Sequence, residues 1–412
     1  MSAIRTERPT VDFDHNSPEF SNDVAGQFRK LRETHPVAWS PHHGGYWILT
    51  RYEDVARAAR DDETFSSERS SFDDPCSALT IPGPEVHRQI PIEYDPPQSL
   101  SIRKLTNSLL APKAVEHLRP MIERIVEDCV DRVIESGECD LMLDIAVAVP
   151  ATFTIEWLGM PSEYAERFQQ VEHGMVSFPP GSPDFERAIA LLPWKYAVIV
   201  EELEKRKREP RDDALSYLVT ETMADGNRLS DDDALGVVSL LISGGLDTTA
   251  SLAGQALMYL HRRPDDRDRL IADPELLPDA TEEFLRFFCP VTALGRTVRK
   301  AVEVGGQKLE PGERVLLCWA AANRDPEVFE NPDDVILDRF PNRHQSFGLG
   351  SHRCSGSHVA RVQFAAMITQ ILERMPDYRI DEERSHTYPN QGVASGWAQL
   401  PTTFTSGPRL RN

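Results

Sequence analysis

Apolar residues recur along most of the chain at the spacing of amphipathic helices, and runs with strand-like alternation are short. Residues 34–50 predict a β-hairpin, and a short helix over 53–60 follows it. Further helices are predicted through the middle of the chain, over 99–110, 113–136, 141–158, 162–176, 184–208, 211–224 and 230–262. The pattern therefore predicts a mainly α fold with small β-sheets.

Irregular segments separate these elements. The stretch 65–97 is rich in Pro and Ser, and long segments of this kind within a compact domain are often functional. A Pro-rich break at 178–183 separates two helices and suits a hinge. The last third of the chain predicts the helix 279–288, short strands at 301–304 and 314–319, an acidic irregular segment at 323–343, a helix at 357–375 and short strands through Phe404.

The composition is that of an ordinary globular protein, with 40% hydrophobic and 27% charged residues among 412. No linker or repeat divides the chain, so we expect a single domain over 1–412, with residues 1–15 as a flexible N-terminus. That polar start is neither a signal peptide nor a membrane anchor, and no apolar run reaches the roughly 18 residues of a membrane span. We therefore expect no membrane partner.

Six cysteines show no paired framework, which fits a reducing cytoplasm. The net charge of −21 argues against nucleic acid and against an anionic membrane surface as partners, although a local basic patch stays possible.

One cysteine, Cys354, lies in the glycine-studded stretch FGLGSHRCSG at 347–356, just before the last helix. The spacing around it argues against zinc and iron-sulfur sites, which need several protein ligands. A heme iron needs only one such ligand. Glycines allow the backbone to approach a flat cofactor, and the N-terminus of the following helix would stabilise a thiolate. From these residues alone, a turn with a free cysteine stays the alternative to a single-ligand heme site.

The helix 230–262 carries GGLDTT at 244–249, in its apolar middle. Ser230 and Asp233 form an acidic variant of the capping box at its start. Each glycine costs about 1 kcal/mol relative to alanine in a helix interior. Two interpretations stay open from the residues alone: a close helix crossing with Asp247 on a solvated edge, or a functional groove.

Together these motifs resemble the cytochrome P450 family of heme-thiolate monooxygenases, whose bacterial members have the cysteine loop F-G-x-G-x-H-x-C-x-G. The resemblance covers the chain from Asp95 to the C-terminal strands, with motif order kept. It implies the P450 fold, with heme b between the long central helix and the helix after the cysteine loop. It also implies an acid-alcohol pair on the long helix, Asp247 and Thr248, that handles O2 and relays protons.

The resemblance assigns the remaining residues by position. The heme ligand is Cys354, and the heme-contacting positions are Phe347, Gly348, Gly350, Gly356, Gly244 and Ala360. Propionate contacts fall to Arg103, Arg296 and His352. Glu283, Arg286 and Arg339 match a structural E-x-x-R network. Two positions depart from the family pattern, because Ser99 replaces a histidine and Gln363 replaces a glutamate.

By the same resemblance, the substrate lies on the Thr248 side of the heme, within a mostly apolar set that suggests a small or medium hydrophobic molecule. The set comprises Leu79, Ile81, Ile92, Phe178, Leu240, Val291, Ala293, Leu294, Val393 and Ala394. The chain has no flavin or nicotinamide fingerprint, so electrons from NAD(P)H are expected through a ferredoxin reductase and a ferredoxin. Basic residues near the cysteine are the candidate docking surface: Lys104, Lys113, Arg343, Arg353 and Arg361.

The expected protein is a monomeric cytoplasmic monooxygenase that performs hydroxylation, epoxidation or dealkylation. One alternative keeps the scaffold and runs peroxide-driven oxidation, oxidative coupling or rearrangement. The retained Asp247 and Thr248 disfavour the peroxide-dependent types, which often lose that pair. A second alternative is a heme sensor or carrier, which would not need a proton relay.

Overall fold

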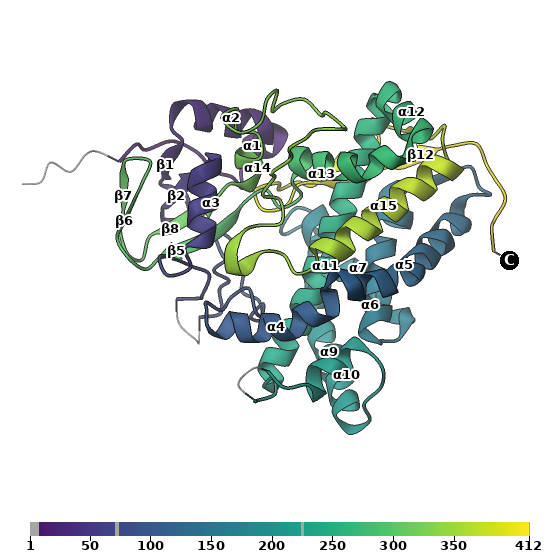
Figure 1. The fold of residues 1–412 in the computed structure, drawn as a ribbon, viewed down its shortest axis with the longest axis horizontal. Coiled ribbons are helices and arrows are strands. Elements are labelled where there is room, and N and C mark those ends of the chain that lie inside the picture. The colour runs from purple at the N-terminus through teal and green to yellow at the C-terminus, as the bar shows by residue number, and fades with distance from the viewer. Residues whose placement is uncertain (1–7, 71–73, 224–225, 412) are drawn as a thin grey trace, which may run out of the picture.

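The computed structural model describes residues 8–70, 74–223 and 226–411, and helices dominate it (Figure 1). A β-rich part with the first three helices lies beside a larger helical part, as the two sides of Figure 1 show. The prediction of a mainly α fold with small sheets is confirmed. The last residue of the helix predicted at 211–224, part of the irregular stretch 65–97 and the first seven residues lie outside the described residues.

The helical part is built around α11 (Asp231–Arg262), which begins where the Ser230 side chain accepts a hydrogen bond from the Asp233 N–H. It packs against α6 (Ala148–Leu158), α7 (Ala165–Ser177), α13 (Leu277–Phe288) and α15 (Ser357–Arg374). α5 (Pro112–Val133) lies against α15. Apolar side chains of these helices form the largest hydrophobic core of the protein.

Proline sets the ends of two helices that sequence pattern alone joins to their neighbours. The segment predicted at 184–208 is two helices, because Pro193 lies in the first turn of α9 (Leu192–Arg208) and separates it from α8 (Pro183–Ala190). The segment predicted at 141–158 starts as a π-helix, Leu141–Ala146, and Pro150 lies in the first turn of α6. The remaining helices are α1 (Pro18–Asn22), α2 (Val24–Thr34), α3 (Tyr52–Arg60), α4 (Gln98–Leu110), α10 (Ala214–Thr220), α12 (Pro264–Ala272) and α14 (Trp319–Ala322).

The main sheet has five strands in the order β1-β2-β8-β5-β3. The predicted hairpin is confirmed as β1 (Val37–Ser40) paired antiparallel with β2 (Tyr46–Leu49). β8 (Arg314–Leu317) runs parallel to β2, while β5 (Leu294–Val298) and β3 (Phe65–Ser66) continue the sheet by antiparallel pairing.

Three smaller sheets complete the described strands. They are β4 (Glu138–Asp140) with β12 (Pro401–Thr403) and β9 (Arg379–Ile380), β6 (Val302–Val304) with β7 (Gln307–Leu309), and β10 (His386–Thr387) with β11 (Trp397–Gln399).

The N-terminal segment from Thr10 is fixed against the main sheet, which corrects the expected flexibility of residues 8–15. The Val11 N–H donates to the Trp39 carbonyl at 2.9 Å. Phe13 and His15 are buried, and Phe13 packs on Phe20. Apolar burial and a backbone hydrogen bond therefore hold this segment in place.

Two helical stretches among the described residues, Leu141–Leu158 and Asp231–Arg262, are apolar and long enough to cross a membrane. Their apolar windows are 72% and 61% buried inside the protein, and the core helix of a folded protein passes the same test. The expectation that no apolar segment is long enough to span a membrane was wrong. A helix buried in a protein core needs apolar residues just as a helix in lipid does, so both have a similar composition.

Candidate functional site

The cysteine loop is held by backbone hydrogen bonds immediately before α15. The Cys354 N–H donates to the Phe347 carbonyl at 2.8 Å, and the Gly348 N–H donates to the Gln345 carbonyl at 2.8 Å. Gly348 and Gly350 have φ angles of 65° and 69°, which favour glycine. A Cβ on Gly348 would meet nothing nearer than the His352 carbonyl oxygen at 3.9 Å, so this face of the loop is open.

Gly350 lies against α3. A Cβ there would lie 2.6 Å from the carbonyl oxygen of Ala59 in α3. Its small size is therefore required for the close approach of the loop to α3. Gly356 does face the cysteine, because a Cβ there would lie 3.8 Å from Sγ of Cys354.

The environment of Cys354 acts on its thiol in two opposed directions. Burial among protein atoms raises its pKa, whereas a hydrogen bond from the Gly356 N–H and the charges of Arg103, Arg353 and Arg361 favour the thiolate. Cys354 as a whole residue is exposed. Among the described residues no group of three or more His, Cys, Asp or Glu side chains could hold a metal ion. The donor set fits a group that takes one protein ligand.

Three donor side chains meet beside this loop, and the one ion pair that they make among the described residues joins Nε2 of His352 to Asp62 at 4.0 Å. Arg296 is 3% exposed, and its Nη1 donates to the Gly295 carbonyl at 2.7 Å. Burial lowers the pKa of Arg296 to about 10, although Asp62 and Asp95 oppose that shift. Arg103 donates to the Arg353 carbonyl. A buried cation is costly without a counter-charge, so this cluster suits a bound anion.

His352 is the third member of the cluster. It is 8% exposed, and among the described residues neither ring nitrogen finds a hydrogen-bond partner. Burial and the charges of Arg296 and Arg103 lower the pKa of its imidazole to about 3. Ser99 lies one turn before Arg103 on α4 and has a buried hydroxyl that is likewise unpartnered within the described residues. These orphaned donors fit the two propionates of a heme, and Ser99 offers a hydroxyl where relatives have histidine.

The two glycines in the middle of α11 serve different purposes. A Cβ on Gly245 would lie 3.3 Å from Oγ1 of Thr154 in α6, so Gly245 allows a close helix crossing. Gly244 is exposed, and a Cβ there would meet only Leu240 Cδ1 at 3.8 Å. Thr248 lies one turn further on, and its hydroxyl donates to the Gly244 carbonyl at 2.9 Å. Gly244 thus faces open space on one side of α11, with Thr248 next to it along the helix.

Asp247 does not lie on a solvated edge. Its carboxylate is 2.7 Å from Nδ1 of His173 on α7, and it accepts a hydrogen bond from the Tyr388 hydroxyl at 2.7 Å. Sequence reasoning missed both partners, because 74 and 141 positions separate them from Asp247 and neither belongs to a motif.

Glu283 and Arg286 form a fully buried pair on α13, with Nε–Oε2 and Nη2–Oε1 distances of 2.7 and 2.8 Å. Arg339 joins from the irregular segment with Nε 2.9 Å from Oε2 of Glu283. Arg286 also donates to the carbonyls of Asn323 and Pro332. The network therefore ties α13 to the segment that precedes the cysteine loop, and it lies apart from the donors around Cys354.

Other positions in the cysteine loop and α15 are mainly packing positions. The Phe347 ring packs against the main core, with the Arg361 guanidinium 4.5 Å from its centroid. Ala360 is half-buried one turn after Gly356, to whose carbonyl its N–H donates at 2.9 Å. Gln363 is buried on the same helix.

The structure divides the expected substrate-contacting residues into two groups. Ile81 and Ala293 are packed in the cluster of Phe13, Phe20 and Ile48, so both contribute to the core. Leu79 is buried as well. The others are at least partly accessible: Ile92, Phe178, Leu240, Val291, Leu294, Val393 and Ala394.

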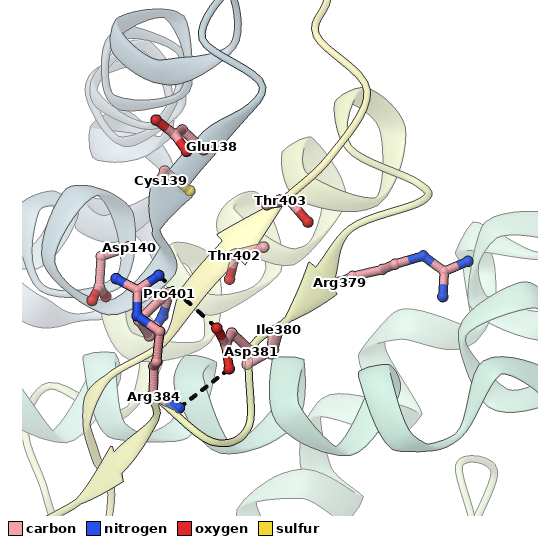
Figure 2. Close-up of a pocket in the computed structure, with 10 residues that line it drawn as sticks. All are labelled: Glu138, Cys139, Asp140, Arg379, Ile380, Asp381, Arg384, Pro401, Thr402 and Thr403. Carbon is pink, nitrogen blue, oxygen red and sulfur yellow. Dashed lines mark hydrogen bonds and ion pairs between the residues drawn. The ribbon is translucent and has the colours of Figure 1, made fainter.

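Two cavities lie away from the cysteine loop. One, of about 830 Å³, is lined by α7, α8 and the β10–β11 hairpin, and includes His173 and Phe178. The other, of about 590 Å³, lies on the β4-β12-β9 sheet, with Asp140, Asp381, Arg379 and Arg384 around it (Figure 2). The Asp381 carboxylate there accepts from the Arg384 backbone N–H at 3.2 Å. This second cavity takes no residue from α11 or the cysteine loop.

Four of the five candidate docking cations, Lys104, Lys113, Arg343 and Arg353, are exposed. Arg361 is engaged internally, because its Nε and Nη2 lie 2.5 and 2.7 Å from the carboxylate of Glu282. Its charge is therefore partly neutralised before any partner approaches.

The structure has a mainly helical fold, a lone cysteine in a glycine loop at a helix N-terminus, and a cluster of buried donors beside it. These features fit a heme-thiolate protein. Comparison with known proteins agrees with this class. The family model Cytochrome P450 matches residues 194–388. The chain is 32% identical over 408 residues to a steroid C26-monooxygenase of Mycolicibacterium smegmatis, and the alignment covers 98% of each of the two chains.

Solved structures give the same result. One is Mycobacterium marinum cytochrome P450 CYP268A2 in complex with pseudoionone, with a TM-score of 0.87 and 27% identity over 97% of this chain and 100% of that one. Another is CYP109E1 from Bacillus megaterium in complex with testosterone, with a TM-score of 0.83 and 26% identity over 94% and 99% of the two chains.

The chain belongs to the cytochrome P450 family and is a monooxygenase. The predicted heme-thiolate cofactor is confirmed by this membership. When bound, that cofactor supplies the activation of dioxygen, which side chains of the protein do not provide. Cys354 as its ligand, and Arg103, Arg296, His352 and Ser99 as its anchors, stay predictions from the chemistry of the site.

Proposed function

We propose that this P450 inserts one oxygen atom from O2 into a hydrophobic molecule of the steroid or terpenoid class. The observation that carries the proposal is the open space at Gly244, which has the apolar Leu240 and the Thr248 hydroxyl as its neighbours along α11. Apolar walls with a few placed polar groups are typical of sites for such molecules. The relatives support the class, since one is named for action on a steroid and others bind testosterone or pseudoionone.

The test uses testosterone and pseudoionone as probes. Either probe should displace water from the iron and shift the optical spectrum of the purified enzyme. The Leu240→Asp variant should bind the same probe with lower affinity than the wild-type enzyme. Turnover under ¹⁸O2 with a surrogate ferredoxin should then give a product heavier by one ¹⁸O atom. Absence of a shift with both probes would contradict the substrate class, and oxygen drawn from added peroxide alone would favour the peroxide-driven alternative.

We further propose that a ferredoxin docks beside the cysteine loop in the cytoplasm, where free cysteines of this kind persist. Lys104 and Lys113 are exposed at α4 and the start of α5, so they can attract an acidic partner despite the net charge of −21.

The double variant Lys104→Glu and Lys113→Glu should raise the KM for ferredoxin about tenfold at low salt, less at high salt where charges are screened. The control is the double variant Lys300→Glu and Lys308→Glu, the same total charge change at two other exposed lysines. Equal effects from this control would point to net charge and would contradict a local docking surface.

A further inference from the structure

The cavity of about 830 Å³ beside α7 lies apart from the cysteine loop. Its walls come from α7, α8 and the β10–β11 hairpin, and none of the described residues that line it belongs to α11 or to the loop at 347–356. A cavity of this volume can enclose most of a drug-sized molecule. It is therefore a candidate for a second binding site, distinct from the open space at Gly244.

Apolar groups cover much of the cavity wall. A Cβ on Gly174 of α7 would lie 2.7 Å from Cβ of Ala188 in α8, so the two helices meet directly there. Phe178, just after α7, lines the cavity with 36% of its surface exposed. Leu191 after α8 and Pro389 after β10 extend the apolar lining. Covering such a surface with an apolar molecule is favourable, because water leaves both surfaces.

The titratable side chains at this cavity do not select an ion. Asp184 and Arg187 of α8 form an ion pair with each other. Both ring nitrogens of His173 lie within hydrogen-bonding distance of other groups of the protein. His386 of β10 is exposed to water. The charges at the cavity are therefore neutralised or solvated, which favours a neutral ligand.

One buried polar group of the lining has no partner. Ser177 on α7 is 8% exposed, and its hydroxyl oxygen finds no hydrogen-bond partner among the described residues. Buried hydroxyls are normally paired, because leaving one unpaired costs free energy. A serine hydroxyl both donates and accepts, so a hydroxyl or a ketone oxygen held in the cavity would give Ser177 its missing partner after rotation about its Cα–Cβ bond.

We propose that this cavity binds a small neutral molecule, largely apolar, with one hydroxyl or ketone oxygen that hydrogen-bonds to Ser177. The molecule is a second ligand and not the reacting substrate, because its site takes no residue from α11 or from the cysteine loop. The proposal does not depend on the substrate class proposed above, so either can fail without the other.

The first experiment counts bound 1-naphthol, a neutral bicyclic compound with one hydroxyl, by equilibrium dialysis of the oxidised holoenzyme without reductant. Ala190 is the exposed last residue of α8 and lines the cavity, so Ala190→Trp places a large side chain there. This variant should bind one 1-naphthol fewer per chain than the wild-type protein, with the same Soret titration. Ala272→Trp, at the exposed last residue of α12, is the matched control and should bind as the wild type does.

Equal numbers of 1-naphthol bound by the wild-type protein and Ala190→Trp would overturn the proposal. So would a Soret response that disappears together with the lost molecule, because that molecule would then have been bound at the iron.

The second experiment tests the polar contact with Ser177→Ala. The affinity of the Soret-silent site for 1-naphthol should fall about tenfold, whereas its affinity for naphthalene, which lacks the hydroxyl, should not change. The melting temperature without ligand should not fall, because the Ser177 hydroxyl makes no hydrogen bond within the described part of the chain. An equal loss of affinity for both compounds, or no loss for either, would overturn the assignment of Ser177 as the polar partner.

Discussion

At the scale of single residues, the neighbouring glycines of the GGLDTT motif have different structural roles. From sequence, Gly244 and Gly245 fit either a helix crossing or a groove, and the structure assigns one reason to each. Gly245 meets Thr154 of α6, while Gly244 faces open space. Sequence cannot make this distinction, because it depends on which side of α11 another helix crosses.

The glycines give a paired prediction. Gly245→Ala should destabilise the protein, because its Cβ would lie 3.3 Å from Thr154 Oγ1 and one of the two helices must shift. Gly244→Ala meets no such contact and should gain up to about 1 kcal/mol of helix stability. Thermal unfolding by circular dichroism measures the difference. A lower melting temperature for Gly244→Ala than for Gly245→Ala would contradict these assignments.

Thr248 supports a prediction on coupling. Its hydroxyl lies beside Gly244, so Thr248→Ala should let oxygen reduction run to hydrogen peroxide and lower the product formed per NADPH oxidised. Thr248→Ser keeps a hydroxyl and serves as the control. Peroxide and product are measured together in one assay. Unchanged coupling in Thr248→Ala would contradict a role of the Thr248 hydroxyl in oxygen activation.

At the scale of elements, side chains brace the irregular segments around the cysteine. Glu282 on α13 binds Arg361 of α15 and, at 3.0 Å, His344 of the segment before the cysteine loop. Burial alone would raise the pKa of Glu282, but the hydrogen bonds from Arg361 and His344 outweigh it and lower the pKa to about 2. The charged carboxylate is therefore part of what fixes the loop.

The pH dependence of this brace follows from the sign of the shift. A carboxyl with a lowered folded pKa contributes stability above its ordinary pKa, near 4.5, and the contribution is lost as pH falls toward about 2. Glu282→Gln should therefore lower the free energy of unfolding by about 1 to 2 kcal/mol at neutral pH. The free energy of unfolding of the variant should also change less with pH in the acid range. Glu275→Gln, on an exposed side chain, is the control. The account fails here if both variants have the same acid midpoint.

Element prediction from sequence worked where many apolar positions recur, as in α11 and α15. It missed α2 and α12, since α12 buries only Asp266 and Leu270 and α2 buries only Phe28, Leu31 and Arg32. Such helices have too few apolar positions for a periodic signal. It also joined α8 to α9, where Pro193 should have indicated an end.

At the scale of the whole molecule, the site collects residues from every third of the chain. Arg103 comes from α4, Arg296 from β5 and His352 from the cysteine loop, and the fold brings them close together although neither ring nitrogen of His352 finds a hydrogen-bond partner among the described residues. Family motifs in the sequence predict each position singly. Sequence does not predict the orphaned state of the cluster or the two partners of Asp247, because both are products of packing between distant segments.

The central claim is that Cys354 is the thiolate ligand of a heme, and the carbon-monoxide difference spectrum of the reduced protein tests it most directly. The wild-type protein should show the red-shifted Soret band of a thiolate-ligated heme, and Cys76→Ser should keep it. Cys354→Ser should lose that band. A wild-type spectrum in Cys354→Ser would contradict the account.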